Sequence, residues 1–252
     1  MHLFVFFCVA LYSVMSAVVG VRLVLRARHT RGLPELLMGV AYASAPGFGY
    51  PLVVVGSGVV DRTVSSLLFG VGQACIVFGV TCFLFFNGRV FRPESRQARV
   101  AAALGGLALG VSSWHRVKVH VAVGAAAISL SSVRRDTIVT VVVLGLAYAW
   151  TATEGWRQHR MMRRRAQIGL GDPVVANRFL LWAIAGALQC VSDAVIAFSV
   201  HRGDNLTADL LPLFATSSVG AVNSVLLVLI FMPPAAYVRW LSRGPRGALA
   251  AV

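Results

Sequence analysis

The chain has 252 residues, of which 58% are hydrophobic and only 13% are charged, and its mean hydropathy is +0.77. Soluble domains carry about 25% charged residues, so this composition excludes an ordinary soluble protein and indicates a polytopic membrane protein. The net charge of +14 does not point to nucleic acid here, because no separate polar domain exists to bind it. We therefore expect the lipid bilayer as a partner and no nucleic acid.

Seven segments are apolar enough over about 20 residues to cross a bilayer. We predict an all-α fold, a single transmembrane domain over residues 1–252 that forms a polytopic membrane bundle of seven helices. In chain order, the expected spans are roughly 3–25, 34–58, 63–88, 98–114, 137–156, 179–200 and 209–232.

The stretch at 115–136 is expected on the outer face, as a loop or an interfacial segment. Its weakly hydrophobic part, 119–133, is too short for a span and can form an interfacial helix, a hairpin or a helix extension. An eighth span here would place the arginines after residue 157 outside, against the preference of basic residues for the cytoplasmic side.

The distribution of basic residues predicts the orientation. With the N-terminus outside and the C-terminus inside, the inner loops and tail hold 17 Lys and Arg and the outer side holds six. This asymmetry follows the positive-inside rule. Only one of the 23 basic side chains is a lysine, which suggests a GC-rich genome. We therefore expect a multi-pass protein of a bacterial inner membrane.

The segment 157–178 is predicted as a basic inner loop. The letters GLGDP within it are expected to end one helix and to begin the next, with Asp172 as the cap. The arginines can serve only to anchor the orientation. They can also bind a cytoplasmic or membrane protein partner, and the candidate partner-binding residues are then Arg160, Arg163, Arg164, Arg165 and Asp172.

The passage MRRR…GLGDPVVANRFLLW in this region resembles uncharacterised bacterial seven-transmembrane-helix integral membrane proteins. The resemblance covers about a tenth of the chain. It implies a seven-span fold and brings no known activity.

One acidic residue, Asp193, lies deep in a predicted span. Fourteen residues after Phe179, it is expected about 21 Å from the inner edge, in the outer third of the hydrocarbon. No Arg or Lys is expected at that depth, so Asp193 lacks an ion partner. An ionisable residue in a membrane commonly marks a functional site, although a hydrogen bond between helices also explains it. Glu154, in contrast, lies at the inner end of its span, within reach of the inner arginines.

Other polar residues can join Asp193 in an outward-facing pocket among the second, third, sixth and seventh spans. The second span contains AYASAPGFGYP, whose prolines and glycines are expected to break the helix. Prolines and serines can also be mere packing devices. The candidate ligand-binding residues are Asp193, Gln189, Ser192, Gln73, Ser44 and Tyr50, with Ser218 and Asn223 on a possible path inward.

No catalytic residue, metal site or cofactor is predicted. The last span has no lysine for a retinal Schiff base, the histidines lie at membrane edges, and no phosphate-binding or nucleophile motif occurs. An enzyme is therefore not expected.

Three functions remain open. A receptor-like protein would sense a small ligand from the outer side and signal through the basic inner loop. A small-solute or proton-coupled transporter or channel would instead need a polar route to both sides. An accessory subunit would use its polar residues only to pack within a larger membrane complex.

Overall fold

The computed structural model describes residues 2–124, 130–203 and 210–242. Within these residues all regular secondary structure is helical and no β-strand occurs, which confirms the predicted helical bundle. The helices are α1 (His2–Thr30), α2 (Leu33–Tyr42), the π-helix η1 (Ala43–Gly49), α3 (Tyr50–Gly58), α4 (Arg62–Phe91), α5 (Arg96–Val123), α6 (Leu130–Gln167), α7 (Pro173–Arg202), α8 (Leu210–Phe231) and α9 (Ala235–Ser242).

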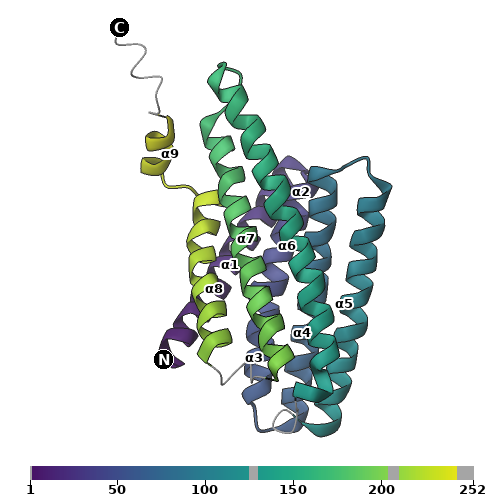
Figure 1. Cartoon of the computed structure of the whole chain (residues 1–252). Coiled ribbons are helices and arrows are strands. Elements are labelled where there is room, and N and C mark those ends of the chain that lie inside the picture. The colour runs from purple at the N-terminus through teal and green to yellow at the C-terminus, as the bar shows by residue number, and fades with distance from the viewer. Residues whose placement is uncertain (1, 125–129, 204–209, 243–252) are drawn as a thin grey trace.

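The long helices lie side by side, and successive ones run in opposite directions (Figure 1). In this view α6 and α7 lie in front, α4 and α5 stand at the right, α8 lies at the left, and α1 crosses obliquely behind. The pair α6 and α7 makes the most extensive contact in the bundle. The short helix α9 lies beyond the end of α8, at the end of the bundle where α6 meets α7.

Among the described residues, six helices or continuous helical segments are long and apolar enough to cross a membrane, as expected of a multi-pass membrane protein. They are Leu3–Thr30, Leu33–Gly58, Arg62–Phe91, Ser132–Gln167, Pro173–Arg202 and Pro212–Phe231. The expected span at 98–114 lies within α5, which is not among the six. Glycines, serines and basic residues interrupt the apolar stretch of α5 and lower its hydropathy.

The second span was expected to be broken, but its helix continues through the proline. Residues Ala43–Gly49 form a π-helix with Pro46 inside it, between α2 and α3. Proline has no backbone N–H and its ring displaces the preceding turn, so an ordinary α-helical hydrogen bond is lost. The wider π turn accommodates this loss, and the N–H of Tyr50 reaches back to the carbonyl of Ala45.

The segment 157–178 is mostly helix rather than the predicted loop. α6 continues to Gln167, because residues 157–167 contain arginine, glutamine and alanine, which favour the helix, and no glycine or proline. α7 then begins at Pro173. The turn between them forms where Gly169 adopts a positive φ of 83°. Asp172 caps α7 as predicted, since its Oδ1 accepts a hydrogen bond of 2.8 Å from the N–H of Val174.

The described residues of the 115–136 segment also belong to helices. Residues 115–123 continue α5 and residues 130–136 begin α6, which corresponds to the helix extension that the sequence left open. Residues 125–129 lie outside the described part of the chain. The His115 Nδ1 and Asp136 Oδ2 atoms lie 2.5 Å apart and join the two helices near their ends.

Candidate functional site

A cavity of about 70 Å³ lies inside the bundle, where α1, α2, η1, α4, α6, α7 and α8 meet. A single water needs roughly 10–15 Å³ by a comparable measure, so the cavity has room for a small molecule. Aromatic rings form much of the wall, and polar atoms come from two side-chain amides, a threonine hydroxyl and the tyrosine hydroxyls. The residues concerned are Tyr12, Tyr42, Phe83, Tyr148 and Trp182 for the rings, and Gln189, Asn223 and Thr151 for the amides and the threonine hydroxyl.

The cavity exists because small residues face these large rings. Ala41, Ala45, Gly79, Ala185 and Gly186 line it from α2, η1, α4 and α7. The π-helix and α4 approach closely: a Cβ on Gly79 would lie 2.7 Å from the backbone nitrogen of Ala45. Small residues at membrane helix interfaces allow backbones to approach this closely.

The cavity lies in the half of the bundle that carries the arginine-rich helix ends. Trp182 lies nine residues after Pro173, or about 14 Å along α7. Ile230 is the penultimate residue of α8, and Met38 is the sixth residue of the continuous helical segment Leu33–Gly58. The sequence placed the pocket in the opposite half, beside Asp193. The sequence-based prediction relied on the positions of polar residues, whereas the observed cavity forms where small side chains face large ones.

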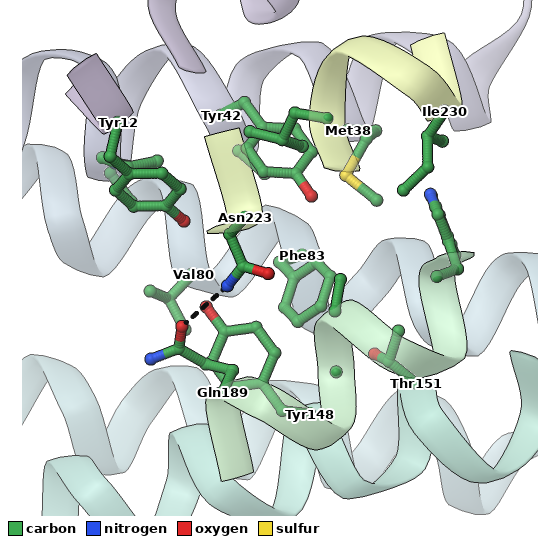
Figure 2. Close-up of a pocket in the computed structure, with 18 residues that line it drawn as sticks. Tyr12, Met38, Tyr42, Val80, Phe83, Tyr148, Thr151, Gln189, Asn223 and Ile230 are labelled. Atoms are coloured by element: carbon green, nitrogen blue, oxygen red, sulfur yellow. Dashed lines mark hydrogen bonds between the residues drawn. The ribbon is translucent and has the colours of Figure 1, made fainter. Parts of the chain in front are cut away.

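Three of the predicted ligand-binding and path residues come together at the edge of this cavity. Nε2 of Gln189 donates to Oδ1 of Asp193 at 3.4 Å, and Nδ2 of Asn223 donates to Oε1 of Gln189 at 3.3 Å. Both hydrogen bonds are long. Figure 2 shows Asn223 reaching from α8 into the space between Tyr12, Tyr42 and Phe83, with Gln189 beside Tyr148. Gln189 and Asn223 line the cavity, and Asp193 lies one helical turn beyond Gln189.

The Asp193 carboxyl is buried and only partly satisfied. Asp193 is only 4% exposed, and its Oδ2 has no hydrogen-bond partner in the described part of the chain. Oδ2 would lie 4.0 Å from a Cβ on Gly145, so α6 packs directly against it. The phenols of Tyr12 and Tyr148 and the Cys190 thiol are within electrostatic range. No Arg or Lys forms an ion pair with Asp193 among the described residues.

The remaining predicted ligand residues lie elsewhere. Gln73 is buried on α4, and its Oε1 has no hydrogen-bond partner among the residues that the structure describes. Ser192 is buried on α7, and neither residue lines the cavity. Ser44 and Ser218 are partly buried outside the lining, and Tyr50 is 44% exposed on the bundle surface. The structure therefore unites Asp193, Gln189 and Asn223 and leaves the other five apart.

A second polar network continues from the cavity toward the arginine-rich end. Thr151 lines the cavity, and its Oγ1 accepts a hydrogen bond of 3.0 Å from Nδ2 of Asn87, which is fully buried. One turn further along α6, Glu154 pairs with Arg92 at 2.9 Å. The sequence placed Glu154 within reach of the inner arginines, and this pair confirms it. Asn87 gave no signal in the sequence, because a lone asparagine in a long apolar segment has many possible partners.

The candidate partner-binding residues stand at this same end of the bundle. Arg160, Arg163, Arg164 and Arg165 are exposed on the last turns of α6, and none forms an ion pair within the described residues. Nδ1 of His159 donates to the carbonyl of Ala176 at 2.8 Å and ties α6 to α7 just below them. Nδ2 of Asn177 donates to the Tyr237 hydroxyl at 2.6 Å and holds α9 against α7.

The aromatic walls of the cavity were missed by the sequence analysis. In the sequence these residues look like ordinary packing residues, since each stands alone in an apolar span. They are Tyr12, Tyr42, Phe83, Tyr148 and Trp182. Only the tertiary arrangement brings them to one place. Among the described residues, no three His, Cys, Asp or Glu side chains are placed to hold a metal ion. No model of a known protein family, no curated protein and no solved structure matches this chain.

Proposed function

We propose that this chain is a receptor-like protein of a bacterial inner membrane, which binds a small molecule in the internal cavity and signals through the basic end of α6 and α7. The observation that carries the proposal is the cavity itself. It is concave, mostly apolar and aromatic, and contains a few fixed polar groups, which is the usual character of a small-molecule site. The proposed binding site therefore lies in the arginine-rich half of the bundle, whereas the sequence analysis expected it in the outer half.

Seven spans form part of this proposal. α4 and α6 run in the same direction, so the chain between them must return, and it returns as α5 along their length (Figure 1). α5 has 28 residues, or about 42 Å of helix, which is enough to cross a hydrocarbon core of about 30 Å. With the N-terminus outside, the exposed arginines of α6 then face the cytoplasm, as the positive-inside rule favours.

The connection from the cavity to a partner runs along continuous helices. Tyr148 and Thr151 line the cavity on the same helix that carries Arg160 and Arg163 near its end. α6 has 38 residues, or about 57 Å, and so extends beyond the membrane core. A ligand that changes the packing at Tyr148 would therefore move the exposed arginines, and an acidic surface on a cytoplasmic or membrane partner would detect the movement.

α6 and α7 are built to move as one unit. A Cβ on Gly186 of α7 would lie 2.9 Å from the Tyr148 carbonyl of α6, so the two backbones are in direct contact beside the cavity. The hydrogen bond from His159 to Ala176 holds them together again near the turn. The movable boundary is then the one between this pair and the helices α1, α2, α4 and α8, and that boundary contains the cavity.

Spin-label distances test this proposal. The four native cysteines are replaced by alanine, and labels are placed at Leu170, which is 77% exposed in the turn after α6, and at the exposed Glu94 in the turn after α4. Isobutylamine, isobutanol and isobutyrate are added in turn, since they share a small branched skeleton and differ in charge. We expect at least one to bind and to change the distance between the labels. Binding with an unchanged distance would contradict the signalling role.

A transporter is the second candidate, and the polar network below the cavity favours it. Thr151, Asn87, Glu154 and Arg92 provide polar groups between the cavity and the arginine-rich end, whereas a sealed receptor does not need them. Uptake and proton flux in proteoliposomes separate the two functions. Flux that disappears in Asp193→Asn would establish transport, and an absence of flux from folded protein would favour the receptor.

A further inference from the structure

The hydrogen bonds from Asp193 to Asn223 have a fixed direction. When Asp193 is ionised, its carboxylate can only accept hydrogen bonds, so Gln189 turns its amide NH₂ toward Asp193, and the 3.4 Å contact has this direction. The Gln189 carbonyl oxygen then faces α8 and accepts from the NH₂ of Asn223 at 3.3 Å. Asn223 is left with its carbonyl oxygen free. The carboxylate thus determines which end of Asn223 faces the cavity.

Asn223 presents that free acceptor to the cavity. The residue is 6% exposed and lines the cavity, and its Oδ1 has no partner among the described residues. Figure 2 shows Oδ1 pointing toward Phe83 and the middle of the lining residues. The other unpartnered oxygen in this group, Oδ2 of Asp193, is also an acceptor. A molecule that satisfies the Asn223 carbonyl oxygen must therefore supply a hydrogen-bond donor.

The charge around the site favours a positive donor. Within the described residues, the Asp193 carboxylate has no basic partner, and its immediate titratable neighbours are Tyr12 from α1, Tyr148 from α6 and Cys190 from α7. All three are neutral or negative and cannot balance the carboxylate. An unpaired charge is costly in a low-dielectric interior, so a bound cation would stabilise the ionised form of Asp193 by pairing with it.

The walls of the cavity also suit a cation. Aromatic rings from five helices line the cavity, and they belong to Tyr12, Tyr42, Phe83, Tyr148 and Trp182. The face of an aromatic ring carries partial negative charge and attracts ammonium groups, most strongly where water is excluded. An anion would meet both the ring faces and the carboxylate unfavourably.

We propose that the cavity binds a small organic ammonium ion, held by the Asn223 carbonyl oxygen that the Asp193–Gln189 pair orients and by the surrounding aromatic rings. This proposal rests on the proposed function, because it specifies the ligand class of the same cavity. It assigns Asn223 as the ligand contact, and Gln189 and Asp193 as positioning residues that also supply the negative charge.

The test measures the Kd of isobutylamine, isobutanol and isobutyrate for the full chain in detergent at pH 7 by isothermal titration. A charge-assisted hydrogen bond together with cation–π contacts is expected to make isobutylamine bind about tenfold or more tightly than isobutanol, with isobutyrate weakest. Equal affinities of isobutylamine and isobutanol, or tighter binding of isobutyrate, would overturn the ammonium proposal and leave the ligand-binding function standing. No binding of any of the three would overturn both.

Variants test the orienting role separately. Asp193→Asn and Asn223→Leu should each reduce the preference for isobutylamine over isobutanol to about threefold or less. Asp193→Asn removes the negative charge, and Asn223→Leu removes the carbonyl oxygen that contacts the ligand. The control Ser199→Ala changes a buried hydroxyl nearer the end of α7, outside the cavity, which has no hydrogen-bond partner in the described part of the chain. This variant should leave the preference unchanged. A preference unchanged in both Asp193→Asn and Asn223→Leu would overturn the assignment.

A charge-swapped variant covers the case in which the single variants do not fold. Asp193→Asn combined with Asn223→Asp keeps one carboxylate and places it directly at the cavity. We expect this double variant to bind isobutylamine at least as tightly as the unmodified chain does. A folded double variant with no preference for isobutylamine would contradict the proposal.

Discussion

The guanidinium of Arg92, which is 54% exposed, donates from Nε at 3.1 Å and from Nη2 at 2.9 Å to the same oxygen of Glu154, which is 8% exposed. The contact joins the end of α4 to α6 below the cavity. Removing Arg92 would leave the buried Glu154 carboxylate without its only ion partner among the described residues. Because solvent screens the exposed arginine, we expect Arg92→Met to lower the free energy of unfolding by about 1–2 kcal/mol.

Thermal unfolding in detergent, followed by circular dichroism, checks this expectation. The double variant Arg92→Met with Glu154→Gln should be more stable than Arg92→Met alone, because it leaves no buried charge unpaired. Equal stability of the two variants would show that the Glu154 carboxylate does not depend on Arg92.

The hydrogen bonds of Thr151 provide a second prediction. Thr151 is buried and contacts Asn87 in both directions, at 3.0 and 3.2 Å, whereas Thr153 is exposed and bonds only to the backbone of its own helix. Thr151→Val should destabilise the protein by about 1 kcal/mol, since hydrogen bonds between membrane helices contribute on that order. Thr153→Val, the same change two residues away, should alter stability by less than about 0.5 kcal/mol. Equal effects in chemical unfolding by sodium dodecyl sulfate would contradict the assigned role.

The close approach of α4 to the π-helix leads to a third prediction. A Cβ on Gly79 would lie 2.7 Å from the nitrogen and 2.8 Å from the Cβ of Ala45, and neither position can easily yield. Gly79→Ala is therefore expected to cost about 1–3 kcal/mol through overpacking. At Gly110 in α5 a Cβ would meet nothing within 4 Å, so Gly110→Ala should be neutral or stabilising by up to about 1 kcal/mol. The Tm values of the two variants test the close contact between Gly79 and Ala45. A Tm for Gly79→Ala as high as that for Gly110→Ala would contradict this contact.

The orientation and the number of spans can be measured with single cysteines in the cysteine-free chain. Glu94 and Arg134 are exposed on either side of α5, and Val60 and Leu170 are exposed in turns at opposite ends of the bundle. A membrane-impermeant maleimide added to intact cells should label cysteines at Val60 and Arg134, and should label those at Glu94 and Leu170 only after lysis. Labelling of Glu94 and Arg134 from the same side would mean that α5 does not cross.

Local features of this fold could be predicted from the sequence, because they depend on neighbouring residues. Asp172 followed by Pro173 identifies the start of α7, and the apolar segments identify six of the helices. The extent of α6 could not be predicted in the same way. A bilayer sets the minimum length of a spanning helix but does not end it, so the arginines after residue 157 continue the helix.

The site was only partly predictable for a related reason. Asp193, Gln189 and Asn223 stood out because polar groups are costly in a membrane and need partners, and the structure brings them together. Pro46 indicated a disturbed helix, but whether the chain breaks or widens into a π turn depends on α1 and α4, which pack against it. The cavity depends on which small residue faces which ring across several helices, and the order of residues in one chain does not contain that information directly.

The central claim, that the internal cavity is a ligand site, is tested most directly by filling it. Ala185 lines the cavity on α7, whereas Ala103 is exposed on α5, so Ala185→Phe and Ala103→Phe add the same side chain inside and outside the site. Isothermal titration of isobutylamine should give the same Kd for Ala103→Phe and the unmodified chain, and at least tenfold weaker binding for folded Ala185→Phe. Unchanged affinity in a folded Ala185→Phe variant would place the ligand elsewhere and contradict the account.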